Sequence, residues 1–308
     1  MVMPHSPLRS RSRSRLRLRP ANPRGFSLVE MIISIALIGT LAVLATPLLR
    51  LPITAWSEAS VRADLVQAAQ AAEGLLAQDL QAALPGSVRV QQVGARVLVE
   101  MLEVRAQGRH RFIGPGAGAC VPAGCGGDAL QAACADTCFT SLGPLEGNAP
   151  VGGADWVVVL GAPPTGNAYF GGNVAVPGGF KTRLVDAVPA AEGQRVRHAA
   201  FSFGTLSAER RFYIVAQPIT WDCNPGTGKL TRVAGYPIAA VQPLVFFGAS
   251  SNVVVATGLA GCTLRFVAGT GTSSGTLLAN VQLQRSGPGG QGVERFEMVS
   301  QFMLPQAR

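Results

Sequence analysis

The segment "RGFSLVEMIISIALIGTLAVLATPLLR", residues 24–50, decides how this chain is organised. Its core, Met31–Leu49, holds 19 residues without a charge. As a helix, such a core spans roughly 29 Å, close to the thickness of the hydrocarbon layer of a membrane. A single carboxylate, Glu30, stands at the entrance of the core, and a Gly25-Phe26 pair precedes it. The segment predicts a membrane-spanning helix with an acid at its start, and that acid calls for a partner.

Most of the net charge of +9 belongs to the leader, residues 1–25, which holds seven arginines and no acid. The rest of the chain keeps 19 basic side chains (26 less seven) against 17 acidic ones. This near balance gives no support for a basic nucleic-acid-binding face, and we expect no nucleic acid as a partner. The arginines predict a single-pass topology with a cytoplasmic N-terminus and an exported C-terminal part.

A secretory signal peptide is an alternative, because it also combines a basic region with an apolar segment. Its cleavage site needs small residues after the apolar segment, whereas Thr46-Pro47-Leu48-Leu49-Arg50-Leu51-Pro52 follows here. That sequence is a poor fit, so the segment is interpreted as an anchor.

The helix is predicted to resume after Pro52, giving one long, kinked helix. Between Trp56 and Leu84, apolar residues recur every three or four positions, which is typical of an amphipathic helix. These residues are Val61, Leu65, Ala68 or Ala69, Ala72, Leu75 or Leu76, Leu80 and Leu84. The stretch "LPGS", residues 84–87, should end the helix, because proline and glycine disfavour its continuation.

Beyond this helix, alternating apolar and polar residues predict strands joined by Gly, Pro, Asn and Ser turns. Residues 87–102 read as a hairpin around Gly94, and further strands are expected at 155–161, 195–204, 211–223, 230–247, 263–269, 276–285 and 294–304. The predicted fold is α+β, with a long N-terminal helix packed on a β-rich head. The predicted parts are a leader (1–25), a helix (26–84, spanning the membrane over 26–49) and a globular domain (85–308).

All six cysteines follow the apolar segment, so export would place them where disulfides form. Cys120, Cys125, Cys134 and Cys138 have the spacing C-x4-C-x8-C-x3-C, which lacks the C-x2-C pairs of a good zinc site. We expect disulfides among these four, with three connectivities open, and Cys223 and Cys262 form a natural second unit.

Enzyme chemistry finds little support, and we expect neither catalysis nor a cofactor. His110 and His198 are the two histidines after the leader, and no Ser or Cys has a nucleophile-elbow setting. The glycine-rich stretches match neither the dinucleotide nor the P-loop pattern. His198 is interpreted as a strand residue that faces solvent or an edge. The three tryptophans, Trp56, Trp156 and Trp221, are interpreted as core or interface anchors.

The stretch "RGFSLVE", residues 24–30, closely resembles the cleavage and methylation site of type IV prepilins and type II secretion pseudopilins. The resemblance implies that a prepilin peptidase, which is also a methyltransferase, cuts between Gly25 and Phe26 and methylates the new Phe26 amine. It also implies that Glu30 pairs with the N-terminal amine of an adjacent subunit. Gly39 and Pro47 match residues that let this helix partly unwind in the family, although tolerated kinks in a membrane helix explain them nearly as well.

The downstream sequence resembles minor pilins of mannose-sensitive haemagglutinin (MSHA) pilus biogenesis. The matching stretches are residues 84–90, 97–112, 213–233, 261–284 and 297–308. The resemblance implies a Cys223–Cys262 disulfide, whereas the Cys120–Cys138 cluster looks like an extra loop. His110 departs from the family, which usually has an aromatic residue there.

The implied function is a minor pilin-like structural subunit of an MSHA-type type IV pilus, located in the inner membrane and then in the filament. Its implied partners are the prepilin peptidase and other pilins or pseudopilins. One alternative is a minor pseudopilin at the tip of a type II secretion pseudopilus. A pilus-tip adhesin or DNA-uptake receptor, with the Cys120–Cys138 loop as its binding tip, is another.

Overall fold

A computed structural model provides the structure of the chain. It describes residues 25–111, 129–130, 135–160, 169, 180–190, 193–204, 206–269, 275–287 and 292–305. The chain divides into two compact units, Met1–Ala55 and Trp56–Arg308. The first unit contributes a helix, whereas the second contains the β-sheets and their core, so each is described by itself.

Helix α1 (Leu28–Gln81) is assigned as one α-helix of 54 residues, which includes Pro47 and Pro52. The prediction of one long helix is confirmed, and the helix continues through Pro52 without a break. A proline inside a helix removes one backbone hydrogen bond and crowds one carbonyl, a cost that a long helix can carry when both flanks are good helix formers. The first unit uses the N-terminal half of α1, and the second unit uses its C-terminal half.

The predicted amphipathic stripe is confirmed in the second unit. Leu65, Ala69, Ala72, Leu76 and Leu80 are all buried, at the spacing expected of one helix face. Of the alternatives Leu75 and Leu76, the structure places Leu76 in the stripe, because Leu76 is buried while Leu75 is 43% exposed. Burial of this stripe holds the second half of α1 on the head.

The helix ends at Gln81, three residues before the predicted end at Leu84. The following backbone pairs with a neighbouring strand instead of continuing the helical ladder. The Val104 amide donates to the Ala82 carbonyl, and the Leu84 amide donates to the Leu102 carbonyl, both at 2.8 Å. Strand pairing thus satisfies the backbone of these residues in place of helical hydrogen bonds.

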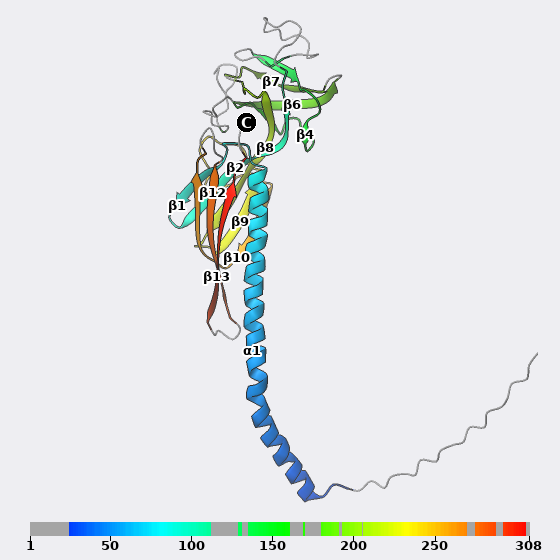
Figure 1. The fold of residues 1–308 in the computed structure, drawn as a ribbon, viewed down its shortest axis with the longest axis vertical. Coiled ribbons are helices and arrows are strands. Elements are labelled where there is room, and N and C mark those ends of the chain that lie inside the picture. Colours follow the sequence, from blue (N-terminus) through cyan, green and yellow to red (C-terminus); the bar gives the residue numbers. More distant parts are fainter. Residues whose placement is uncertain are drawn as a thin grey trace, which may run out of the picture. The chain divides into compact units, whose positions relative to one another are not determined.

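Two antiparallel sheets follow α1 in the described part of the chain (Figure 1). The larger has ten strands, with the order β1-β2-β8-β5-β6-β7-β3, to which β9 adds on β8, β10 on β9 and β4 on β2. Its strands are β1 (Arg89–Val93), β2 (Arg96–Arg109), β3 (Asp136–Thr140), β4 (Glu146–Gly147), β5 (Trp156–Val158), β6 (Lys181–Ala190), β7 (Gly193–Phe201), β8 (Arg211–Asn224), β9 (Lys229–Ala234) and β10 (Ser251–Thr257). The smaller has the order β11-β12-β13, formed by β11 (Leu259–Val267), β12 (Thr276–Ser286) and β13 (Val293–Met303).

The hairpin predicted around Gly94 is confirmed as β1 and β2, with Val93 opposite Arg96. Gly94 has a φ of 60°, which a two-residue hairpin turn requires and glycine adopts without strain. The strand expected over residues 230–247 is wrong beyond Ala234. Gly235 follows with a φ of 80°, and the chain leaves the sheet there. Strands β3, β4, β6 and β10 were not predicted.

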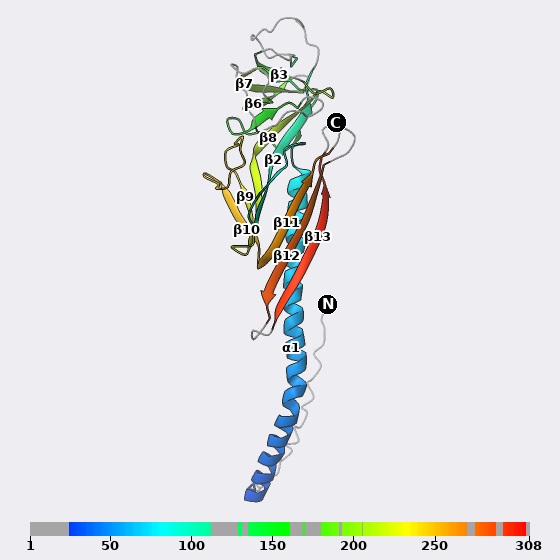
Figure 2. The same cartoon turned by 90° about the vertical axis from the view of Figure 1, so that its left-hand side faces the viewer.

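The main core of the second unit forms where α1 meets both sheets. Figures 1 and 2 show the second half of α1 beside β11–β13 and beside the β2–β8–β9 part of the larger sheet. Trp221 of β8 is the largest side chain in this core and is 1% exposed. A separate core takes residues from β3, β6, β7 and β8, among others, and contains Phe139, Phe201, Phe203 and Phe212.

A disulfide joins Cys223 of β8 to Cys262 of β11, and so connects the two sheets. It spans 39 residues of sequence, so it constrains a large part of the unfolded chain. Replacing both cysteines by alanine is expected to lower the free energy of unfolding by about 2–4 kcal/mol. Urea unfolding of the oxidised proteins measures this difference, and equal midpoints for wild type and the double variant would contradict it.

Candidate functional site

The N-terminal segment contains the start of α1. Gly25, Phe26 and Ser27 precede the helix, which begins at Leu28. The Met31 amide donates to the Ser27 carbonyl at 3.1 Å, so Ser27 occupies the N-cap position. Gly25 and Phe26 therefore lie on non-helical backbone, with Phe26 80% exposed. This junction is sterically open in the first unit.

Glu30 lies in the first turn of α1, where the positive end of the helix dipole favours an acid. Its backbone carbonyl accepts a hydrogen bond from the Ser34 hydroxyl at 2.7 Å. Within the described residues, its carboxylate has no hydrogen bond and no ion pair. The helix start thus explains an acid at this position in part, but the described residues supply no cation to match it.

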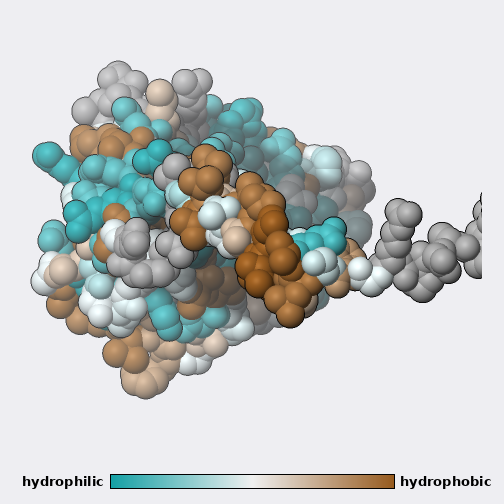
Figure 3. Space-filling view, turned by 90° about the horizontal axis from the view of Figure 1, so that it is seen from below, coloured by the Kyte–Doolittle hydropathy of each residue, from teal (hydrophilic) through white to brown (hydrophobic). Residues whose placement is uncertain are grey.

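The first unit presents apolar side chains all round the helix. Residues 28–48 form a 21-residue stretch of mean hydropathy 2.4, long and apolar enough to cross a membrane, with none of it buried inside the structure. Figure 3, seen from below, shows apolar residues, coloured brown, gathered over this helix. A helix that is apolar on every side needs lipid or other protein around it. The stretch is consistent with single-pass membrane anchoring.

Packing within the chain does not explain the glycines of this segment. A Cβ atom added to Gly25 or Gly39 would meet no atom within 4 Å. Neither residue has a φ in the left-handed region that favours glycine over other residues. Packing among the described residues therefore does not require glycine at these two positions.

In the second unit, a buried carboxylate holds the end of α1. Asp79 accepts hydrogen bonds from the Trp221 indole at 2.8 Å and from the Arg232 guanidinium at 2.7 and 2.9 Å. The hydrogen bond to Asp79 is also the main reason that the pKa of Arg232 is raised. Sequence reasoning missed this site, although Asp79 interrupts the buried stripe three residues after Leu76. An acid on a buried face requires a cationic or donor partner.

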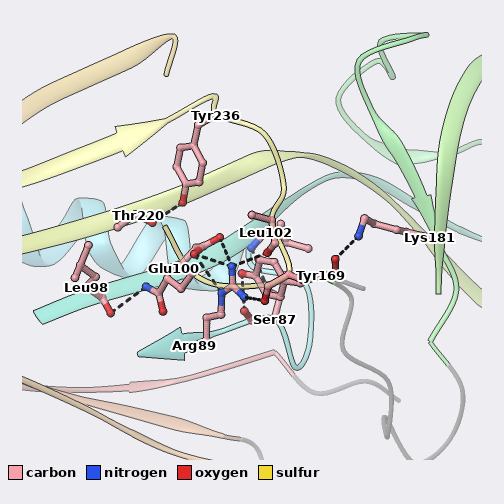
Figure 4. Close-up of polar contacts among 12 residues, drawn as sticks. Ser87, Arg89, Leu98, Glu100, Leu102, Tyr169, Lys181, Thr220 and Tyr236 are labelled. Carbon is pink, nitrogen blue, oxygen red and sulfur yellow. Dashed lines mark hydrogen bonds and ion pairs between the residues drawn. The ribbon is translucent and has the colours of Figure 1, made fainter. Parts of the chain in front are cut away.

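A second polar network lies beside the β1–β2 hairpin (Figure 4). The Arg89 guanidinium donates to both carboxylate oxygens of Glu100 at 3.0 Å, and to the carbonyls of Ala239 and Ala240. It also stacks 3.6 Å from the ring centre of Tyr169, whose hydroxyl donates to a backbone carbonyl. These contacts join the hairpin to the segment after β9.

Burial shifts the titration of this network. It raises the pKa of the fully buried Glu100, while the hydrogen bond and charge of Arg89 act in the opposite direction. Burial also lowers the pKa of Lys181 to about 8, with a smaller contribution from the charge of Arg89. The Lys181 ammonium donates to the Tyr169 carbonyl and lies 5.5 Å from the centre of the Trp156 ring. These contacts of the buried Lys181 ammonium connect β6 to Tyr169 and to Trp156 of β5.

Both histidines are buried. The expectation that His198 faces solvent or an edge is wrong, because His198 is 2% exposed in strand β7. It packs against Phe139 and Phe203, with ring centres 5.8 Å apart in each pair. His110 also packs against Phe139, with ring centres 6.4 Å apart. The alternation along "RVRHAAFSF" is compatible with His198 on either face of a sheet, and pairing of the strand in the sheet places it on the buried face.

These histidines predict an acid-sensitive head. Burial lowers the pKa of His198 and of His110, so the folded state takes up protons less readily than the unfolded state. The contribution of these histidines to the free energy of unfolding is complete above about pH 6.5, the pKa of histidine in the unfolded chain. It is lost as the pH falls below that value. His198→Phe should therefore make the decrease in the free energy of unfolding on acidification smaller, by up to about 1.4 kcal/mol per pH unit. Urea unfolding between pH 7.5 and 5.5 measures the difference, and parallel curves for wild type and variant would refute it.

The other predicted sites have different outcomes. Cys138 is disulfide-bonded, whereas Cys120, Cys125 and Cys134 lie outside the described residues. Of the tryptophans, Trp221 is buried, Trp156 is half-buried and stacks under Arg183, and Trp56 is exposed. Across the described ranges, no group of three or more His, Cys, Asp or Glu side chains could hold a metal ion.

Comparison with known families gives one match. Residues 20–46 match the prokaryotic N-terminal methylation motif, which covers Gly25, Phe26 and Glu30. No curated protein and no solved structure matches the chain. The motif, followed by an apolar helix and a largely β-sheet domain, indicates a protein of the type IV pilin and pseudopilin class. It implies processing by a prepilin peptidase and assembly with other pilins.

Proposed function

We propose that the chain is a minor pilin-like structural subunit of an MSHA-type type IV pilus. In this proposal its counterpart is MshO, the MSHA pilus biogenesis minor pilin, which its downstream sequence resembles. Support comes from the downstream sequence resemblance and from the size of the head, which begins at Trp56 and extends to residue 308. The subunit acts by packing into a filament and carries out no reaction of its own.

In this proposal, a prepilin peptidase cuts between Gly25 and Phe26 on the cytoplasmic side and methylates the Phe26 amine. Gly25 lies on exposed, non-helical backbone, and its missing side chain is not needed for packing within the chain. A peptidase cleft that admits only a narrow backbone accounts for a glycine at this position. The arginine-rich leader keeps the junction in the cytoplasm, while the head enters the periplasm.

The unmatched carboxylate of Glu30 carries the proposal. It lies at the edge of an apolar helix, where an unpaired charge costs a few kcal/mol. Cleavage creates a positive amine on Phe26, four residues away, and the same amine exists on every processed subunit. The Glu30 carboxylate pairs with the Phe26 amine of an adjacent subunit, while apolar contacts replace lipid around the helices.

The first test is the mass of the mature N-terminus. Protein purified from the membrane is expected to begin at N-methylated Phe26, and the leader of 25 residues is expected to be absent. Gly25→Leu should retain the leader, because a bulky side chain would block the cleft without disturbing any contact in the subunit. A mature chain that keeps the leader, or that begins after Pro47, would contradict the pilin mechanism.

A minor pseudopilin of a type II secretion system shares every N-terminal feature. Deleting the gene separates the two functions, since loss of pili supports the MSHA-type assignment and loss of protein secretion with normal pili supports the pseudopilin. Either outcome preserves processing after Gly25 and pairing of Glu30.

A further inference from the structure

An open cavity of about 290 Å³ lies in the head, apart from the surfaces used in the proposed function. Its floor is the β2–β8 ladder, in which Gln107 lies opposite Tyr213. One wall is formed by the end of α1 and the residues after it, from Gln81 to Pro85, and another by Glu146 and Gly147 of β4. All these elements belong to the second unit.

Among the described residues, the charged side chains of this cavity have partners with one exception. Arg105 is paired with the buried carboxylate of Asp155 at 2.9 Å. The Gln107 amide donates to the Glu146 carboxylate at 3.1 Å. Arg211 is different, because its Nε is buried and has no hydrogen-bond acceptor, and it forms no ion pair with the described residues. Among the described residues, one cationic donor of the cavity is therefore without an anion.

The strand partner of Arg211 makes its unpaired positive charge still less favourable. Its cross-strand partner in the β2–β8 ladder is Arg109, so two positive side chains lie directly opposite each other. Like charges at such positions repel. An anion near Arg211 would accept from the free guanidinium and reduce this repulsion.

We propose that this cavity is a binding site for a single carboxylate group, held by the Arg211 guanidinium above the Gln107–Tyr213 floor. A guanidinium matches the two oxygens of a carboxylate. The Glu146 carboxylate at the cavity wall disfavours more highly charged anions such as phosphate. The carboxylate can come from an acidic side chain of a neighbouring subunit or from a small organic acid, and the site does not depend on the proposed filament function.

Binding is tested on the full mature chain in detergent micelles, titrated with N-acetyl-glutamate-N-methylamide and followed by NMR. The glutamine analogue has the same shape without the charge. Wild type should bind the glutamate analogue at least about tenfold more tightly than the glutamine analogue, as expected for one charge-assisted hydrogen bond. Equal binding of the two analogues would overturn the proposal.

Arg211→Gln should remove the preference for the charged analogue. Arg197→Gln is the matched control, because Arg197 is half-exposed, pairs with Asp186 and does not line the cavity. Arg211→Lys keeps the charge and provides a second variant if Arg211→Gln fails to fold. It should bind the charged analogue more weakly than wild type but still prefer it. A preference unchanged in Arg211→Gln, or lost in Arg197→Gln, would overturn the role of Arg211.

The source of the carboxylate is tested in cells with a photo-reactive phenylalanine at Gln81, an exposed residue of the cavity wall. A cross-link to another subunit that is lost in Arg211→Gln assigns the carboxylate to that subunit. Charge-dependent binding in vitro without a cross-link assigns it to a small acid. A cross-link of equal yield with and without Arg211, combined with no preference between the analogues, would overturn the site.

Discussion

Glu30→Ala is expected to leave cleavage after Gly25 intact and to reduce incorporation of the subunit into filaments by at least about tenfold. The variant removes the carboxylate, which has no ion pair among the described residues, and with it the proposed pair with the Phe26 amine of a neighbour. A pair surrounded by apolar helices acts in a low dielectric, where it is stronger than at an exposed surface. A tenfold change corresponds to about 1.4 kcal/mol, a small part of the interaction expected there. Immunoblots of sheared filaments and of whole cells measure the incorporated fraction.

Glu58→Ala is the matched control for this experiment. Glu58 is another exposed glutamate of α1, but it lies beyond the apolar stretch that ends at residue 48. This variant should be processed and incorporated like wild type. Normal incorporation of Glu30→Ala, or an equal loss in both variants, would contradict the proposed pairing.

Asp79→Ala is expected to lower the free energy of unfolding of the head by about 3–5 kcal/mol. It removes the only acceptor described for the Trp221 indole and leaves the Arg232 guanidinium without its carboxylate. Removing one partner from a buried pair is costly because the remaining charge stays buried and unmatched. Urea unfolding of the full chain, followed by tryptophan fluorescence, measures the difference.

Asp64→Ala provides the comparison on the same helix. Asp64 also pairs with an arginine, Arg285, at 2.9 Å, but its side chain is 60% exposed. An exposed ion pair contributes about 1 kcal/mol or less. Similar effects of the two substitutions would show that burial of Asp79 does not decide its contribution.

The fold could be predicted from the sequence where one period dominates. The alternation on each side of Gly94 predicted the β1–β2 hairpin, and the three-to-four spacing predicted the buried stripe of α1. Local patterns failed where tertiary contacts determined the backbone. The end of α1 depends on pairing of residues 82–84 with β2, and a helical pattern cannot show that competition. Strand β6 begins at Lys181, and the sequence alone does not show that this lysine is buried.

The candidate sites divide in the same way. Gly25, Phe26 and Glu30 form a contiguous motif whose chemistry depends on sequence distance alone, so the sequence by itself determined it. Tertiary structure decided the sites that join distant strands. Asp79 meets Arg232 across 153 residues, and Arg211 lies opposite Arg109 because β2 pairs with β8. An unmatched charge costs free energy when it is buried, and these residues become buried only when the sheets and α1 pack together.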